Sequence, residues 1–201
     1  LQVNTTILGC EETRAAMVTD PGGNAHQIMN YLKENNFELK VIVLTHAHVD
    51  HIGGVSELKT QSGAELYMHP QEKPVYESAH QMGAMFGVPI DSLPEPDKLI
   101  QEGNTFSVGN IPITVYHTPG HSPGGITLHF KSDEGKDVLI AGDAIFQGSI
   151  GRTDLPGGSY QTLISGIKQK ILTFPDETVI VTGHGPITTV AQEKKFNPFL
   201  T

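Results

Sequence analysis

Short apolar runs recur along this 201-residue chain, and they constrain its fold more than any other feature of the sequence. Each is rich in β-branched residues and is bounded by Gly, Pro, Asp or Asn, which is typical of strands. The runs occupy residues 41–44, 64–68, 111–116, 126–130, 137–141 and 178–182, and segments near 7–8 and 15–18 can add two more. A chain of this length can bury a substantial core, so we expect one domain over residues 1–201.

Helical patterns lie between these runs. One begins after Asn24, a candidate N-cap, and continues to residue 34. A second, shorter pattern can end at Gly63, and a third can begin after Ser159. Residues 71–85 carry a weaker helical pattern, and the three prolines in 86–97 are typical of an ordered surface loop or a lid. Interleaved strands and helices predict the α/β class.

Polar, metal-competent side chains follow four of the apolar runs. The run VIVL leads into H-x-H-x-D-H, and later runs lead into single residues of the same kind. The residues concerned are His46, His48, Asp50 and His51 in the first segment, and then His121, Asp143 and His184. Because α/β sheets build their sites at the carboxyl ends of strands, we expect these side chains to meet.

The segment H-x-H-x-D-H can serve one ion or two. In an extended or tightly turning segment, His46 and His48 point to the same side and can bind one ion together. Asp50 and His51, after a turn that Gly53-Gly54 allow, can bind a second. The alternative is a set of exposed loop histidines with an aspartate that caps a helix. That alternative leaves the other three strand ends unexplained.

The remaining strand ends complete the inventory of ligands. His121 lies in TPGHSPGG, Asp143 follows Gly142, and His184 lies in GHGP. Taken singly, these could be a turn histidine, an exposed helix cap and another loop residue. Together they predict two divalent ions about 3.5 Å apart. His46, His48 and His121 would hold the first ion, Asp50, His51 and His184 the second, and Asp143 would bridge them.

The donor set limits the choice of metal. Imidazole and carboxylate without thiolate suit Zn, Mn or Fe, and we expect Zn. Three further residues could orient a metal ligand through a contact to its side chain without binding the metal: Asp20 in DPGG, Arg152 in GRTD and His117 near the His121 loop. Their alternative roles are a turn aspartate, a surface arginine and a structural histidine.

Composition excludes several classes of function. The formal net charge of −9 argues against a protein that coats nucleic acid or anionic lipid. No apolar stretch approaches the roughly 20 residues of a membrane span. The single cysteine, Cys10, rules out an intramolecular disulfide framework and fits a reducing compartment. We therefore expect a cytoplasmic protein with a small-molecule partner, and neither nucleic acid nor membrane.

The motifs THAHVDH, TPGHSPGG, GDAIF and GHGP, in this order, resemble the metallo-β-lactamase fold hydrolases over essentially the whole chain. The resemblance implies an αββα sandwich with the metal site along one edge. Within that superfamily, GDAIFQGSIGRTDLPGG and the ending NPFL are similar to short, bacterial-type hydroxyacylglutathione hydrolases of the glyoxalase pathway. That resemblance implies hydrolysis of a thioester such as S-lactoylglutathione by a metal-bound bridging hydroxide, which Asp50 would orient.

Two features qualify this expectation. Longer glyoxalase enzymes add a helical segment whose basic residues help hold glutathione, and this sequence ends soon after His184, so a broader thioester range is expected. True β-lactamases generally lack an aspartate at the position of Asp143, which argues against antibiotic hydrolysis. The rival activities are a mononuclear iron persulfide dioxygenase of the same superfamily, a lactonase and a nuclease.

Overall fold

The structure is a computed structural model that describes residues 2–87, 90 and 92–201. The chain divides into two compact units. The first contains residues 1–100 and 107–111, and the second contains residues 101–106 and 112–201. Among the described helices, none is long and apolar enough to span a membrane.

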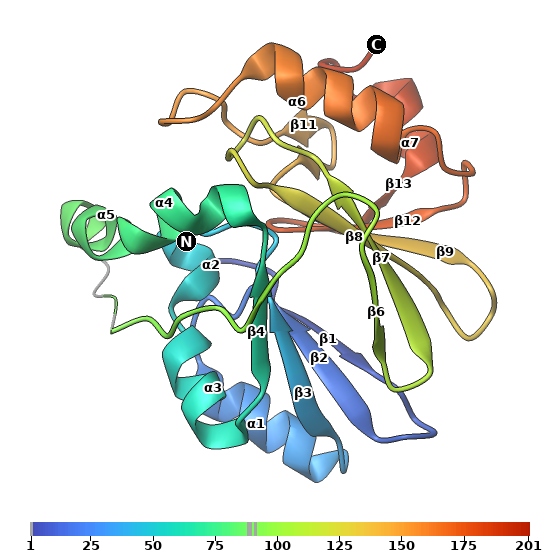
Figure 1. Ribbon diagram of the computed structural model, residues 1–201. Helices are drawn as coiled ribbons and strands as arrows, with labels where there is room; N and C mark the ends of the chain where they lie inside the picture. Colours follow the sequence, from blue (N-terminus) through green and yellow to red (C-terminus); the bar gives the residue numbers. More distant parts are fainter. Residues whose placement is uncertain (1, 88–89, 91) are drawn as a thin grey trace. The chain divides into compact units, whose positions relative to one another are not determined.

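The first unit contains a five-stranded sheet in the order β1-β2-β3-β4-β5. Figure 1 labels the strands β1 to β4. Its strands are β1 (Thr6–Gly9), β2 (Ala15–Thr19), β3 (Glu38–Val43), β4 (Glu65–Met68) and β5 (Lys98–Leu99). β1 pairs antiparallel with β2, and the other neighbours are parallel. The carboxyl ends of β2, β3 and β4 therefore lie at one edge of the sheet.

The described helical segments of the first unit are α1 (Ala25–Glu34), α2 (Val49–Ile52), α3 (Val55–Ser62), the 3-10 turn η1 (Pro70–Glu72), α4 (Lys73–Glu77) and α5 (Ala79–Phe86). α1 and α3 contact each other and both pack against β3. Apolar side chains from both helices, including Leu32 and Leu58, are buried with Ile42 and Leu66 of the sheet. This packing leaves the carboxyl edge of the sheet to short helices and loops.

Close backbone contact ties the DPGG segment to α2. A Cβ atom on Gly22 would lie 1.9 Å from the carbonyl oxygen of Asp50, and one on Gly53 would lie 2.4 Å from that of Gly22. The Gly54 amide donates to the Pro21 carbonyl at 2.6 Å. The glycines thus allow the loop after β2 to pack directly on α2. The sequence predicted that Gly53-Gly54 allow a turn before Asp50 and His51, and this was wrong. Asp50 and His51 lie within α2, and Gly53 follows that helix.

The second sheet has the order β13-β12-β9-β8-β7-β6. Its strands are β6 (Thr105–Val108), β7 (Ile111–His117), β8 (Ile126–Lys131), β9 (Asp137–Gly142), β12 (Val179–Thr182) and β13 (Thr188–Thr189). β8 is antiparallel to both β7 and β9, and β12 is parallel to β9. The carboxyl ends of β7, β9 and β12 therefore share one edge. A small hairpin, β10 (Ile145–Phe146) and β11 (Ser149–Ile150), follows β9.

Helices cover one face of the second sheet. α6 (Tyr160–Gly166) continues into a π-helical turn, η2 (Ile167–Ile171), and α7 (Val190–Phe196) follows β13. Leu163, Ile167 and Ile171 are buried against Leu139 and Ile180. The Ser159 hydroxyl caps α6 by accepting from the Thr162 amide, as the sequence predicted.

The predicted elements are largely confirmed. All eight anticipated strands form, and helices begin after Asn24 and Ser159 and end at Gly63. Asn24 occupies its cap position without a side-chain hydrogen bond, because it adopts the left-handed conformation with φ of +54°. In the predicted 86–97 loop, residues 88, 89 and 91 lie outside the described residues.

Candidate metal centre

Asp20 is a buried carboxylate of the first unit that contacts both Thr45 and His51. It follows β2 in the left-handed conformation, with φ of +51°, and is 2% exposed. Its Oδ1 accepts from the Thr45 amide at 2.7 Å, and its Oδ2 accepts from the Thr45 hydroxyl at 2.5 Å. The same Oδ2 lies 3.1 Å from His51 Nδ1. The carboxylate therefore links the loop after β3 to the imidazole carried by α2.

These contacts favour one tautomer in two of the predicted ligand histidines. A carboxylate facing His51 Nδ1 favours a proton on that atom, which places the lone pair on Nε2. The Thr45 hydroxyl, having given its proton to Asp20, can only accept from His46 Nδ1 at 3.2 Å. The lone pair of His46 is then also on Nε2, where it can bind a cation.

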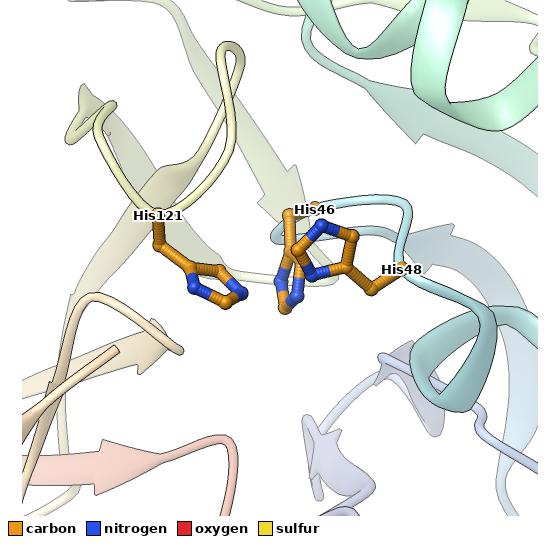
Figure 2. Close-up of side chains that lie close together, drawn as sticks. All are labelled: His46, His48 and His121. Atoms are coloured by element: carbon orange, nitrogen blue, oxygen red, sulfur yellow. The ribbon is translucent and has the colours of Figure 1, made fainter. Parts of the chain in front are cut away.

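The imidazoles of His48 and His51 lie close to that of His46. Its ring centroid lies 4.0 Å from that of His51 and 4.7 Å from that of His48. Figure 2 shows His46 and His48 on the loop after β3, with their rings nearly perpendicular. Ligand-competent atoms of Asp20, His46 and His51 all lie within 4.8 Å of one another. Asp50, in the first turn of α2, is partly buried.

His121 belongs to the second unit and lies on the tight loop after β7, where Figure 2 labels it. Gly120 precedes it with φ of +124°, and a Cβ there would lie 2.5 Å from the Leu163 amide nitrogen. The Gly120 carbonyl accepts from the Ser159 amide at 2.8 Å, so α6 supports the loop directly. His121 Nδ1 lies 2.8 Å from the Arg152 carbonyl oxygen. A carbonyl can only accept, so Nδ1 carries the proton and Nε2 carries the lone pair that a metal needs.

Asp143 lies between two imidazoles at the carboxyl edge of the second sheet. Its Oδ2 is 3.5 Å from His121 Nε2 and 3.6 Å from His184 Nε2. The Gly183 amide donates to the Gly142 carbonyl at 2.7 Å, which joins the ends of β12 and β9. Thr182 Oγ1 donates to the His184 carbonyl at 2.8 Å and shapes the GHGP loop.

The two Asp143 distances suit donors that share cations. They exceed the usual hydrogen-bond range of about 2.7–3.2 Å. Two donors that bind one tetrahedral zinc ion, each about 2.1 Å from it, lie roughly 3.4 Å apart. The second unit thus places one carboxylate oxygen at metal-sharing distance from two imidazole nitrogens.

The other two predicted supporting residues contact the His121 loop, His117 through its ring and Arg152 through its carbonyl. The Lys170 ammonium, on η2, donates to the His117 carbonyl and to Glu102 Oε2, both at 2.7 Å. The His117 ring lies 3.0 Å from the Pro123 carbonyl and supports the His121 loop. Arg152 acts through its carbonyl, because its exposed guanidinium pairs with Asp154 and lowers the pKa of that carboxyl to about 2.

Sequence reasoning missed Glu72. This carboxylate is fully buried, and its Oε2 accepts from the Ala47 amide at 2.9 Å. Ala47 is the residue between His46 and His48. The signal was available, because Glu72 also follows an apolar strand at the edge that carries Asp20 and His46.

Comparison with known proteins assigns the chain to a family. Residues 1–184 match the family model of the metallo-beta-lactamase superfamily. The hydroxyacylglutathione hydrolase GloC of Haemophilus influenzae is 39% identical over 99% of this chain and 93% of its own length. The chain belongs to the metallo-beta-lactamase superfamily. The predicted α/β class with the metallo-β-lactamase fold is thereby confirmed.

Two solved structures share the fold over the full chain. The crystal structure of the B3 metallo-beta-lactamase BLEG-1 has a TM-score of 0.88 and 37% identity, and covers 100% of this chain and 95% of its own. A structure of TTHA1623 in a di-iron-bound form has a TM-score of 0.87 and 35% identity, with 100% and 96% covered. Members of the metallo-beta-lactamase superfamily bind divalent metals, and the His and Asp clusters described above fit that property. The family supports a metal-dependent hydrolase.

Proposed function

We propose that this metallo-beta-lactamase superfamily member hydrolyses acyl-thioesters, with S-lactoylglutathione or a similar 2-hydroxyacyl thioester as substrate. The observation that carries the metal-dependent part is the position of Asp143 Oδ2, at 3.5 and 3.6 Å from two histidine nitrogens. The thioester part rests on the 39% identity to GloC, which extends over nearly the whole of both chains.

The proposed site holds two divalent ions. His46, His48 and His121 hold the first, Asp50, His51 and His184 hold the second, and Asp143 bridges them. Support comes from the Nδ1 contacts of His46, His51 and His121, each of which assigns the lone pair to Nε2. The family model spans all seven residues, from the first unit to the second.

The donors fit the ions on chemical grounds. Imidazole nitrogen and carboxylate oxygen suit Zn and also Fe, and TTHA1623, one of the similar proteins, was solved in a di-iron-bound form. We propose zinc as the native ion. Divalent ions held there supply an acidified water and a Lewis acid for a carbonyl oxygen.

The protein's own residues prepare the reaction. Asp50 is proposed to accept a hydrogen bond from the attacking water and so to orient it. Asp20 holds the His51 imidazole in the tautomer that offers Nε2. Hydrolysis breaks the carbonyl–sulfur bond, and the water oxygen enters the carboxylate product. One of the water's protons reaches the departing thiolate, and the other is released to solvent.

Metal analysis with a substrate panel tests this proposal. Protein purified without added metal should contain two ions per chain and should hydrolyse S-lactoylglutathione faster than oxygen esters or lactones. One iron per chain, with oxygen uptake on glutathione persulfide, would indicate a dioxygenase and contradict the proposal. Two bound ions without thioester hydrolysis would support the metal site and contradict the proposed thioester substrate.

β-Lactam hydrolysis is a second candidate, favoured by the 37% identity to the B3 metallo-beta-lactamase BLEG-1. Asp143 argues against this activity, because true β-lactamases generally lack an aspartate at that position. A chromogenic cephalosporin in the same panel separates the two activities. A higher kcat/KM for the cephalosporin than for every thioester would favour the lactamase.

A further inference from the structure

Glu72 is a buried carboxyl group that the proposed reaction does not use. It is 0% exposed, on the turn η1 after β4. Burial of a carboxylate is costly unless hydrogen bonds and positive charge compensate it. A carboxylate retained at this depth beside a predicted cation site therefore points to a role in that site.

The chain around Glu72 aims it at the loop after β3. β3 and β4 are parallel neighbours, and the Leu44 amide donates to the Tyr67 carbonyl at 3.0 Å, so the two strands end side by side. His69 Nδ1 accepts from the Gln71 amide at 3.2 Å, and the His69 carbonyl accepts from the Glu72 amide at 3.0 Å. This capped turn directs the Glu72 side chain along the edge of the sheet.

The contact falls on the peptide that separates two ligands. Glu72 Oε2 accepts from the Ala47 amide at 2.9 Å, and Ala47 is itself 1% exposed. The directions of the His46 and His48 side chains depend on the backbone torsions at that peptide. A small rotation there would turn one imidazole away from the other.

We propose that Glu72 is a positioning residue for the first metal ion. It holds the Ala47 peptide so that both imidazoles address one cation, and its negative charge favours that cation electrostatically. This inference rests on the proposed metal site and adds a residue that binds neither metal nor substrate. Asp20 holds the same loop through Thr45, so two buried carboxylates fix the segment that begins H-x-H.

The test measures metal affinity and needs no substrate. Co²⁺ and Zn²⁺ dissociation constants are determined by competition with a chromophoric chelator for wild type, Glu72→Gln and Glu72→Ala. Glu72→Ala removes the carboxyl group and its acceptor oxygens, and should weaken binding of the first ion about 10- to 100-fold. Glu72→Gln keeps an oxygen for the Ala47 amide, so its loss should be smaller.

Asp97→Asn is the matched control. Like Glu72, Asp97 is a carboxylate that accepts from a backbone amide, that of Leu66 in β4, at 2.7 Å. Its contact lies in the first half of that strand, whereas the contact of Glu72 lies between His46 and His48. The control variant should lose stability and keep the wild-type metal affinity.

The outcomes test the positioning role of Glu72 separately from the proposed metal site. Wild-type metal affinity in both Glu72 variants would overturn the positioning role while leaving the metal site intact. If Glu72→Ala does not fold, the metal affinity of Glu72→Gln alone tests the positioning role. A wild-type protein that binds no ion would overturn the metal site itself, and with it this inference.

Discussion

Replacement of Asp20 by Asn tests how the first unit controls its histidines. Asn tolerates the left-handed conformation that Asp20 adopts, with φ of +51°, so the backbone is not strained further. The change replaces one acceptor oxygen with an NH2 donor. Whichever oxygen is lost, a buried hydrogen bond to Thr45 is lost or reversed.

The substitution also changes the hydrogen-bond partners of His51 and His46, two of the proposed metal ligands. In the wild type, Asp20 Oδ2 lies 3.1 Å from His51 Nδ1. If the amide nitrogen of Asn takes the place of Oδ2, a donor faces His51 Nδ1 instead of an acceptor. His51 must then accept on Nδ1 and carry its proton on Nε2, the nitrogen proposed to bind the metal. If Thr45 reverses its hydroxyl to accept from the amide, it donates to His46 Nδ1 and imposes the same change there.

The expected magnitudes separate folding from metal binding. Loss of one hydrogen bond to a buried charged group should lower the free energy of unfolding of the metal-free protein by about 1.5–3 kcal/mol. The altered tautomer should weaken metal binding about 10- to 100-fold. Urea denaturation in chelator measures the first quantity, and chelator competition measures the second.

Asp20→Ala provides the comparison. It removes the hydrogen bonds to Thr45 and places no amide donor opposite His51 Nδ1. It should destabilise the fold more than Asn, since Ala is strained in the left-handed region by roughly 1–2 kcal/mol. Unchanged metal affinity in Asp20→Asn, despite a stability loss of the expected size, would refute the assignment of tautomers by this carboxylate.

Four further changes test the site and the fold. Asp143→Ala should remove the ligand that we propose both ions share and abolish turnover, and retained metal stoichiometry with activity would contradict the bridging role. His184→Ala should chiefly empty the second site, so a full complement of two ions by metal analysis would show that this site is wrongly assigned. Gly151→Ala should weaken metal binding, because its Cβ would lie 1.9 Å from the Asp143 carbonyl oxygen and 2.9 Å from the His121 ring; wild-type affinity by chelator competition would argue against that clash. The hydrogen bond from Lys59 lowers the pKa of Asp97, so its stabilisation is present above the unfolded pKa of about 3.9 and is lost as pH falls through the folded pKa. The stability difference between wild type and Asp97→Asn in urea should therefore be constant near pH 7 and shrink below pH ~4, and a difference that grows in acid would contradict this.

The pattern of the chain predicted the elements that local physics controls. β-branched runs between turn residues identified the strands, because strand propensity and burial act over a few residues. Gly63 and Ser159 marked helix ends for similarly local reasons. Asn24 shows the limit, because its cap position was predictable and its left-handed conformation was not.

The candidate site divides along the same line. The sequence by itself determined which residue types follow each strand, and hence that imidazoles and carboxylates would collect at the sheet edges. Only the tertiary structure placed Asp143 Oδ2 between two imidazoles, set the Nδ1 partners of His51 and His121, and brought Glu72 to Ala47. These contacts join segments far apart in the chain, through strand register and single hydrogen bonds that no local pattern encodes.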